Sequence, residues 1–137
     1  MKLLLDTHVF LGYISADTRL PAPFLSSIRD TSNEVFLSAA SIREAVIKHG
    51  LDELPLPAEP AGFLPELRER LGIVLLPIEE GVMVHLTGLP DLHPDPIDRL
   101  LIAQAIRGGM RIVTFDAEIL AHPVARLGRS APDTPSR

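Results

Sequence analysis

Four acidic residues stand at places in the sequence where their side chains could meet in a folded protein. Asp6 and Asp116 each follow a short apolar stretch that we expect to be a buried strand. Glu44 lies in the first turns of one predicted helix, and Asp98 lies in the first turn of another. In open α/β sheets, ligands bind beyond the carboxyl ends of the parallel strands. The sequence therefore predicts an acidic site at that edge, which Asp98 joins if its helix points there.

Carboxylates that gather at one edge of a sheet repel one another, and this repulsion raises their pKa values. A divalent cation removes that cost, and carboxylates together with water are ligands that suit Mg²⁺ or Mn²⁺. The chain has no cysteine, so such a metal would be held by oxygen or imidazole ligands. A bound cation can lower the pKa of a water molecule and stabilise charge on a phosphoryl oxygen. Because no other nucleophile or cofactor motif is visible, the acids favour phosphodiester hydrolysis.

The elements that must position these acids alternate between strands and helices. Short apolar runs predict strands at residues 3–5, 35–37, 73–76 and 111–114. Apolar periodicity and helix-ending residues predict helices at residues 9–14, 24–30, 38–50, 64–71, 79–86 and 96–108. This alternation is typical of an α/β fold with a parallel sheet that is covered on both faces.

Length and composition favour one soluble domain. The chain has 137 residues, and we expect residues 1–128 to form a single domain and residues 129–137 to form a frayed tail. No apolar run reaches the ~18 residues of a membrane helix, and an acid interrupts the start too early for a signal peptide, so we expect a cytoplasmic protein. The net charge of -5 argues against a broad basic surface, but it does not exclude a nuclease, because an acidic metal site contributes to that charge.

Each acid also has a purely structural interpretation. Asp6 could cap the helix that follows it, and Asp98 could be a first-turn acid that the helix dipole favours. Asp116 could be a turn residue. The neighbouring Asp95 precedes a proline, which favours an N-cap. These interpretations do not exclude a metal site, because a residue can cap a helix and also bind a metal.

Glu44 could be the partner of Ser41 in a capping box, a motif that closes the start of a helix. Its surroundings favour a different role, because the residues at helical spacing around it are mostly apolar. A carboxylate within a buried apolar stripe is costly unless it is paired or bound to metal. We therefore expect a helix that is buried on much of its surface, through these neighbours of Glu44: Ala40, Ile42, Ala45, Val46, Ile47 and Leu51.

Four segments, taken in order, resemble the motifs of PIN-domain proteins. Leu4–His8 resembles the strand that opens such domains, and Ser38–Lys48 resembles their second motif. His93–Ala105 closely resembles the third motif of VapC-type toxins, and Val113–Asp116 resembles the fourth. The resemblance spans residues 1–127 in the order that the family has.

The resemblance implies a PIN-like three-layer α/β/α fold with a central, mostly parallel sheet. It also implies an endoribonuclease that depends on Mg²⁺ or Mn²⁺ and hydrolyses RNA, with tRNA as a candidate substrate, by means of metal-activated water. Such an enzyme would be the toxin of a type II toxin–antitoxin pair. It would form a homodimer and be inhibited by a cognate antitoxin that reaches into the acidic site.

The resemblance also assigns roles to individual residues. Thr7 and Thr114 stand where the family has small hydroxyl residues that hydrogen-bond the acids or the metal-bound water, and Asp95 would be an auxiliary acid. The catalytic acids would be Asp6, Glu44, Asp98 and Asp116, and the metal ligands among them Asp6, Asp98 and Asp116.

Three basic residues near the acids in sequence, Arg43, Lys48 and Arg99, are candidates for RNA phosphate contacts. The alternative is that these side chains are solvated or ion-paired. Three histidines are also candidates for metal or RNA contacts: His8, His93 and His122. They are not included among the metal ligands, because lone histidines are more often surface or core residues.

Other functions compete with the nuclease. A signalling domain that accepts phosphate on an aspartate also places acids and Mg²⁺ at this edge, but it needs a lysine after a late strand, and residues 114–116 include none. A catalytically inactive PIN-like RNA-binding module would not require the complete set of acids. A DNA nuclease on the same fold is less favoured in so small a chain.

Overall fold

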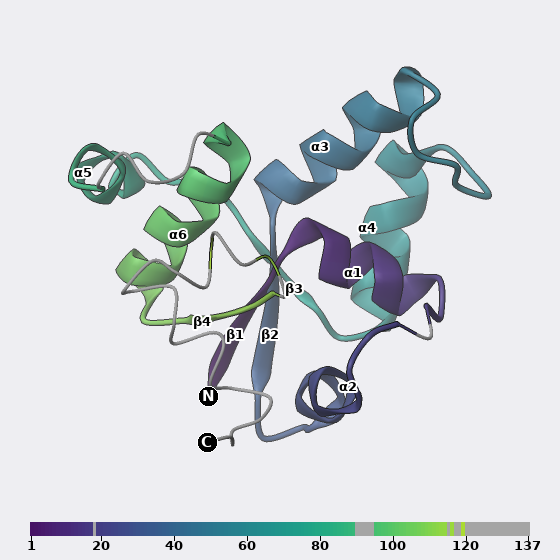
Figure 1. Cartoon of the computed structure of the whole chain (residues 1–137), viewed down its shortest axis with the longest axis horizontal. Helices are drawn as coiled ribbons and strands as arrows, with labels where there is room; N and C mark the ends of the chain where they lie inside the picture. Colours follow the sequence, from purple (N-terminus) through teal and green to yellow (C-terminus); the bar gives the residue numbers. More distant parts are fainter. Residues whose placement is uncertain (18, 90–94, 115, 117–118, 120–137) are drawn as a thin grey trace.

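The computed structural model describes residues 1–17, 19–89, 95–114, 116 and 119 of the chain. Every predicted strand and helix is present in it (Figure 1). The predicted tail at residues 129–137 lies outside the described residues, as do His93 and His122. The elements are β1 (Lys2–Leu5), α1 (Thr7–Ile14), α2 (Ala22–Arg29), β2 (Glu34–Ser38), α3 (Ala39–Gly50), α4 (Pro60–Arg70), β3 (Val74–Leu76), α5 (Val82–Thr87), α6 (Pro96–Gly108) and β4 (Arg111–Val113).

The bounds of some helices differ from those that the sequence predicts. α4 begins at Pro60, before the predicted residue 64, because a proline fits the first position of a helix, where its missing N–H breaks no intrahelical bond. α5 begins at Val82 and is shorter than predicted. None of the helices in the described ranges is long and apolar enough to cross a membrane.

In the described part of the chain, four strands form one sheet in the order β3-β2-β1-β4. β1 is central, with Leu4 opposite Phe36 of β2 on one side and opposite Ile112 of β4 on the other. All of the pairings are parallel, which confirms the predicted sheet. The carboxyl ends of the strands therefore lie at the same edge.

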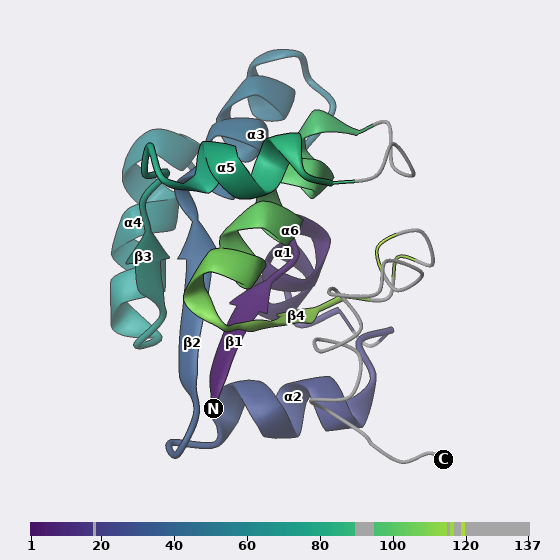
Figure 2. The same cartoon turned by 90° about the vertical axis from the view of Figure 1, so that its left-hand side faces the viewer.

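Different helices cover the two faces of the sheet. Leu3 and Leu5 pack against residues of α1, α2, α3 and α4, whereas Leu4 packs against residues of α6. Figure 1 shows α5 and α6 on one side of the strands and α1, α2 and α4 on the other, and Figure 2 looks at the α5–α6 side. Because β1 is buried on both faces, its apolar residues are consecutive. The predicted three-layer arrangement is confirmed.

The burial of α3 differs from the prediction. Ala40 and Ala45 are buried, but Val46 is 37% exposed, Ile47 is 42% exposed and Leu51, just beyond the helix, is 62% exposed. In Figure 1, α3 continues beyond the ends of the strands, so its second half has no sheet beneath it. The expectation of a helix buried on much of its surface is therefore wrong for this side.

Candidate active site

Asp6 lies where β1 ends, beside the end of β4. Its backbone N–H donates to the carbonyl oxygen of Val113 over 3.1 Å, which continues the pairing of the two strands. Its side chain is buried and accepts a hydrogen bond of 2.7 Å from the hydroxyl of Thr114. The oxygen of that hydroxyl in turn accepts from the backbone N–H of Asp116 over 3.0 Å. One threonine therefore connects Asp6 and Asp116 at the carboxyl edge of the sheet.

The carboxylate of Asp6 does not cap the helix that follows it. Asp6 occupies the N-cap position of α1, but its side chain makes no capping hydrogen bond. Burial raises the pKa of this carboxyl, the hydrogen bond from Thr114 and the charge of His8 lower it, and the charge of Asp116 raises it. The backbone N–H of His8 is near enough to lower the pKa a little, although the two groups are not in hydrogen-bonding geometry. The interpretation of Asp6 as a simple capping residue is therefore wrong.

Ser38, the last residue of β2, is the N-cap of α3. Its hydroxyl oxygen accepts a hydrogen bond from the backbone N–H of Ala40 over 3.0 Å. Ser41 lies inside the helix, where its hydroxyl oxygen accepts a bond of 2.7 Å from the hydroxyl of Thr7. Because the helix begins before Ser41, the capping box of Ser41 and Glu44 is wrong. The hydroxyl of Ser41 instead connects α3 to the start of α1.

Glu44 forms an ion pair along α3. Its Oε2 atom is 3.1 Å from Nζ of Lys48, and its side chain is 14% exposed. Lys48, a candidate RNA contact, is therefore ion-paired in this structure, as the alternative interpretation predicts. The other two basic candidates differ in exposure, since Arg43 is exposed and Arg99 is half-buried.

The start of α6 follows the prediction. The carboxylate of Asp95 accepts hydrogen bonds from the backbone N–H groups of Ile97 over 2.8 Å and of Asp98 over 3.4 Å. These bonds confirm Asp95 as the N-cap, with Pro96 at the favoured first position. Gly109 is the C-cap of the helix, and its φ of 65° lies in the left-handed region that favours glycine.

Asp98 lies within electrostatic reach of the other acids. Its half-buried carboxyl has its pKa raised to about 7, first by burial and then by neighbouring negative charges. Like charges disfavour the ionised form of a carboxyl when they are close to it. The orientation of α6, which the sequence left open, is thus the one that brings Asp98 to the acidic site. The charges that act on it belong, in decreasing order, to Asp95, Asp6, Asp116 and Glu44.

This group of acids fits a divalent cation by its chemistry. Carboxylate oxygens suit Mg²⁺ and Mn²⁺, which also keep water ligands. The raised pKa values of Asp6 and Asp98 reflect burial and repulsion that a cation would offset. Among the described residues, no three acidic or histidine side chains are close enough together to form a ready-made metal site. The fit therefore rests on the donor atoms and their charge.

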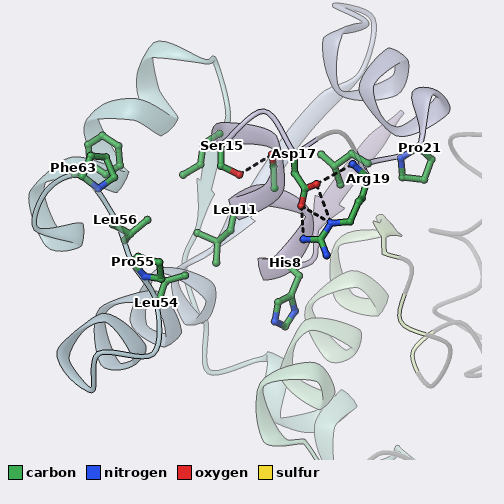
Figure 3. Close-up of a pocket in the computed structure, with 14 residues that line it drawn as sticks. His8, Leu11, Ser15, Asp17, Arg19, Pro21, Leu54, Pro55, Leu56 and Phe63 are labelled. Carbon is green, nitrogen blue, oxygen red and sulfur yellow. Dashed lines mark hydrogen bonds and ion pairs between the residues drawn. The ribbon is translucent and has the colours of Figure 1, made fainter.

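A cavity of about 870 Å³ lies beside the start of α1 (Figure 3). His8, two residues after Asp6, lines it, and most of its other lining residues are apolar. Figure 3 shows Leu11 of α1 and the segment with Leu54 and Leu56 around the same space. None of the four candidate acids lines the cavity, so the acidic site at the sheet edge is separate from it.

Two buried polar residues near the site are not predicted by the sequence. Ser38 is fully buried, and its hydroxyl donates a hydrogen bond of 2.7 Å to Oε1 of Gln104 on α6. The two partners are 66 residues apart, so spacing along the chain carries no signal of this contact. The visible sign is that Gln104 interrupts an apolar part of α6 between Leu101 and Ala105.

Comparison with known proteins agrees with this architecture. The sequence model of the PIN domain matches residues 3–124. Ribonuclease VapC22 of Mycobacterium tuberculosis is 30% identical over 121 residues, which cover 88% of this chain and 91% of that protein. A chain in the crystal structure of VapBC2 from Rickettsia felis, bound to a DNA fragment from their promoter, has a similar fold, with a TM-score of 0.68 at 15% identity. That match covers 90% of this chain and 95% of that chain.

The fold, the order of the motifs and these matches agree with one another. The overall fold is similar to that of a solved VapBC2 chain, and the family match includes β1 to β4. The chain therefore belongs to the PIN-domain family and is similar to its VapC-type ribonucleases.

Proposed function

We propose that this chain is a divalent-metal-dependent endoribonuclease and the toxin of a type II toxin–antitoxin pair. Membership of the PIN-domain family and similarity to a ribonuclease support RNA phosphodiesters as the substrate, and tRNA is the first RNA to test. The observation that carries the proposal is the group of carboxylates whose charges act on Asp98 at the carboxyl edge of the sheet, among them Asp6, Glu44 and Asp116.

Asp6, Asp98 and Asp116 would hold Mg²⁺ or Mn²⁺. When bound, such a cation supplies a Lewis acid that lowers the pKa of a water molecule and offsets charge on the phosphoryl oxygens. Thr114 would orient one of these ligands, because its hydroxyl donates a hydrogen bond of 2.7 Å to Oδ2 of Asp6. The same hydroxyl accepts from the N–H of Asp116 and so keeps the backbone of this acid beside Asp6.

Glu44 would act in proton transfer. Its Oε2 atom is held 3.1 Å from Nζ of Lys48, and its side chain is largely buried. A carboxylate that is oriented in this way can accept a proton from the water that attacks the phosphorus atom. Thr7 supports this arrangement, because its hydroxyl is bonded to Ser41 on the same helix.

RNA binding would rely on a few basic side chains and the cation, because the net charge of the chain is -5. Arg43 directly precedes Glu44 on α3, and Arg99 directly follows Asp98 on α6. Each arginine therefore stands next to a proposed catalytic acid, and we expect both to contact backbone phosphates near the cleaved bond. Lys48 would contact RNA only when its ion pair with Glu44 opens.

Regulation would come from a second protein and from self-association. The similar fold in the VapBC2 structure supports an antitoxin partner that acts in the cytoplasm together with this chain. An apolar antitoxin segment would fit the cavity that His8 lines, and its continuation past His8 would restrict access to the acids. Exposed apolar side chains on α3, β3 and α5 support a homodimer: Val46, Ile47, Val74, Leu75, Met83 and Val84.

Two alternatives have less support. A phospho-acceptor signalling domain needs a lysine after a late strand, and residues 114–116 include none. An inactive RNA-binding module would have no use for several buried or half-buried carboxylates whose mutual repulsion raises the pKa of Asp98.

The first experiment is cleavage of bulk tRNA and of a mixed RNA pool by the purified protein, with Mg²⁺, with Mn²⁺ or with EDTA. We expect discrete cuts that need the metal and vanish in Asp6→Asn, because asparagine keeps the shape of the side chain but removes its charge. Asp52→Asn is the matched control. Asp52 is exposed and has a φ of 59°, a conformation that asparagine tolerates.

The outcomes separate the hypotheses. Absence of cleavage by folded, antitoxin-free protein with every metal and RNA would favour the inactive module. Cleavage that persists in Asp6→Asn would point to a contaminant or to a wrongly assigned site. Loss of cleavage in both Asp6→Asn and Asp52→Asn would mean that the effect is not specific to the acidic site.

A further inference from the structure

A buried amide joins the two helices that carry Glu44 and Asp98. Gln104 lies in the second half of α6 and is 3% exposed. Its Oε1 atom accepts a hydrogen bond of 2.7 Å from the hydroxyl of Ser38, and its Nε2 atom donates to the carbonyl oxygen of Pro77 over 3.3 Å. The amide therefore contacts both the residue that begins α3 and the residue that follows β3.

The partners of the amide allow only one orientation of it. The carbonyl of Pro77 can only accept a hydrogen bond, so Nε2 of Gln104 faces it and Oε1 faces Ser38. The oxygen of Ser38 also accepts from the N–H of Ala40, and its single hydroxyl proton is used for Gln104. All of these bonds form together only when α6 has one rotation about its axis and one position along that axis relative to α3.

Packing alone would not require an amide at this position. The neighbouring residues Leu101, Ile102, Ala103 and Ala105 are buried and apolar. Burial of an amide costs free energy unless its hydrogen bonds are made, and an apolar side chain of similar size would fill the same space without that cost. What the amide adds is direction, because a hydrogen bond depends on the relative orientation of both partners and apolar contact does not.

We propose that Gln104 is a positioning residue that sets the spacing between α3 and α6, and thereby between Glu44 and Asp98. The hydrogen bond between Ser38 and Gln104 is some way along each helix from the acid that the helix carries. Ser38 precedes Glu44 of α3 by six residues, and Gln104 follows Asp98 of α6 by six residues. Its effect on catalysis rests on the proposed nuclease function. Its effect on the spacing of the two helices does not, and it is measured separately.

Gln104→Met is the test variant, because methionine has a similar size and removes both hydrogen bonds of the amide. The carbonyl of Pro77 can be hydrated through an adjoining cavity of about 360 Å³, which Pro77 and Gln104 both line, so we expect the variant to fold. Ile28→Val is the matched control. It trims a buried side chain of α2, a helix that carries no candidate acid, and so it reports general destabilisation.

The spacing of the helices is measured between two spin labels. The chain has no cysteine, so introduced cysteines are the only labelling sites. Val46→Cys on α3 and Arg107→Cys on α6 are suitable, because both positions are exposed. Dilution with unlabelled protein restricts the signal to distances within one chain. We expect a narrow distance distribution in the parent and in Ile28→Val, and a shifted or broader one in Gln104→Met.

The same variants, without labels, are compared for Mn²⁺ binding by water-proton relaxation and for RNA cleavage. Groups that orient metal ligands without touching the metal typically change affinity or activity by roughly 10- to 100-fold. We expect a loss in that range in Mn²⁺ affinity and in kcat for Gln104→Met, with the KM for RNA little changed. Ser38→Ala removes the bond to Gln104 and also the cap of α3, so we expect it to lower the free energy of unfolding by itself. It should add little to the loss of Mn²⁺ affinity in Gln104→Met, because the bond between the two helices is already absent there.

Each outcome decides the proposal. An unchanged distance distribution in Gln104→Met would overturn it, even where the wild-type protein cleaves RNA. Equal effects in Ile28→Val and Gln104→Met would also overturn it, because general destabilisation would then explain both. If the wild-type protein neither cleaves RNA nor binds Mn²⁺, the proposed function fails, and the spin-label distances still decide whether Gln104 positions the helices.

Discussion

Thr114 influences both the charge and the orientation of the acid at the end of β1. Its hydroxyl donates to Asp6, and this bond opposes the larger effect of burial on the pKa of that carboxyl. A hydrogen bond to the ionised form of a carboxyl lowers its pKa. Because the same hydroxyl accepts from the N–H of Asp116, one side chain affects two of the proposed metal ligands.

Thr114→Val replaces the hydroxyl with a methyl group, so we expect the pKa of Asp6 to rise above its wild-type value. The acidic limb of the pH–rate profile for RNA cleavage should then move to higher pH, because a protonated carboxyl does not bind a metal. We expect kcat at neutral pH to fall by roughly 10-fold or more, as for other residues that orient a metal ligand.

The controls for this prediction keep or remove a hydroxyl in defined places. Thr114→Ser retains the hydroxyl and should keep the wild-type profile. Thr87→Val removes the exposed hydroxyl on α5 that donates to the carbonyl of Val84, and it should have no effect. If the profile of Thr114→Val overlaid that of the wild-type protein, the role given to this hydroxyl would be wrong.

Side-chain hydrogen bonds between elements connect all of the segments that carry acids. Thr7 on α1 bonds Ser41 on α3, and Ser38 at the start of α3 bonds Gln104 on α6. The third bond, from Thr114 to Asp6, ties the end of β4 to the end of β1. The acids are thus supported by the packing of elements and do not depend on loop conformation alone.

The start of α6 combines a cap with an electrostatic effect. The carboxylate of Asp95 accepts hydrogen bonds from the backbone N–H groups of Ile97 and Asp98. After burial, the charge of Asp95 has the largest effect in raising the pKa of Asp98. These two effects have opposite consequences for stability at neutral pH. The cap stabilises the helix, and the repulsion between the two carboxylates destabilises the folded protein.

Substitution of Asp95 separates the two effects. Asp95→Ala and Asp95→Asn remove the same charge, but only asparagine keeps a capping oxygen, so we expect the free energy of unfolding in urea to be lower in Asp95→Ala by about 1 kcal/mol. The pKa of Asp98, followed by NMR titration of its carboxyl, should fall in both variants. Equal stability of the two variants would show that the cap contributes nothing.

The acid group also links the stability of the whole molecule to pH. The pKa of Asp98 is about 7 in the folded protein against 3.8 for an aspartate that is fully exposed to water, and that of Asp6 is also raised. Between these values the folded protein binds more protons than the unfolded chain does. The contribution of these carboxyls to the free energy of unfolding is therefore greatest below their pKa in the unfolded chain. It is lost as pH rises through their pKa in the folded protein.

In the presence of EDTA, we therefore expect Asp98 to make the Tm of the wild-type protein higher at about pH 5 than at about pH 8. The drop in Tm between these pH values should be smaller in Asp98→Asn, which has no ionisable group at this position. Saturating Mn²⁺ should raise the wild-type Tm more at the higher pH, because the metal binds the ionised carboxylates. An equal drop in wild-type protein and Asp98→Asn would contradict the assigned pKa.

The sequence by itself determined the features that depend on neighbouring residues. Consecutive apolar residues predicted the buried parallel strands, and the sequence Asp95-Pro96 predicted the start of α6. Because Asp6 directly follows a strand, its place at the carboxyl edge also followed from local order. These features are readable because strands and helix caps are governed by residues only a few positions apart.

The tertiary structure alone decided how the acids are held. The bonds Thr7–Ser41, Ser38–Gln104 and Thr114–Asp6 join residues that are 34, 66 and 108 positions apart. Local spacing wrongly predicted a capping box at Ser41 and a buried outer side of α3. The sequence does not show which partner a hydroxyl or an apolar stripe contacts in the folded protein. Only the packing of α1, α3 and α6 around the sheet brings these partners together, since such bonds form at one relative rotation of the elements.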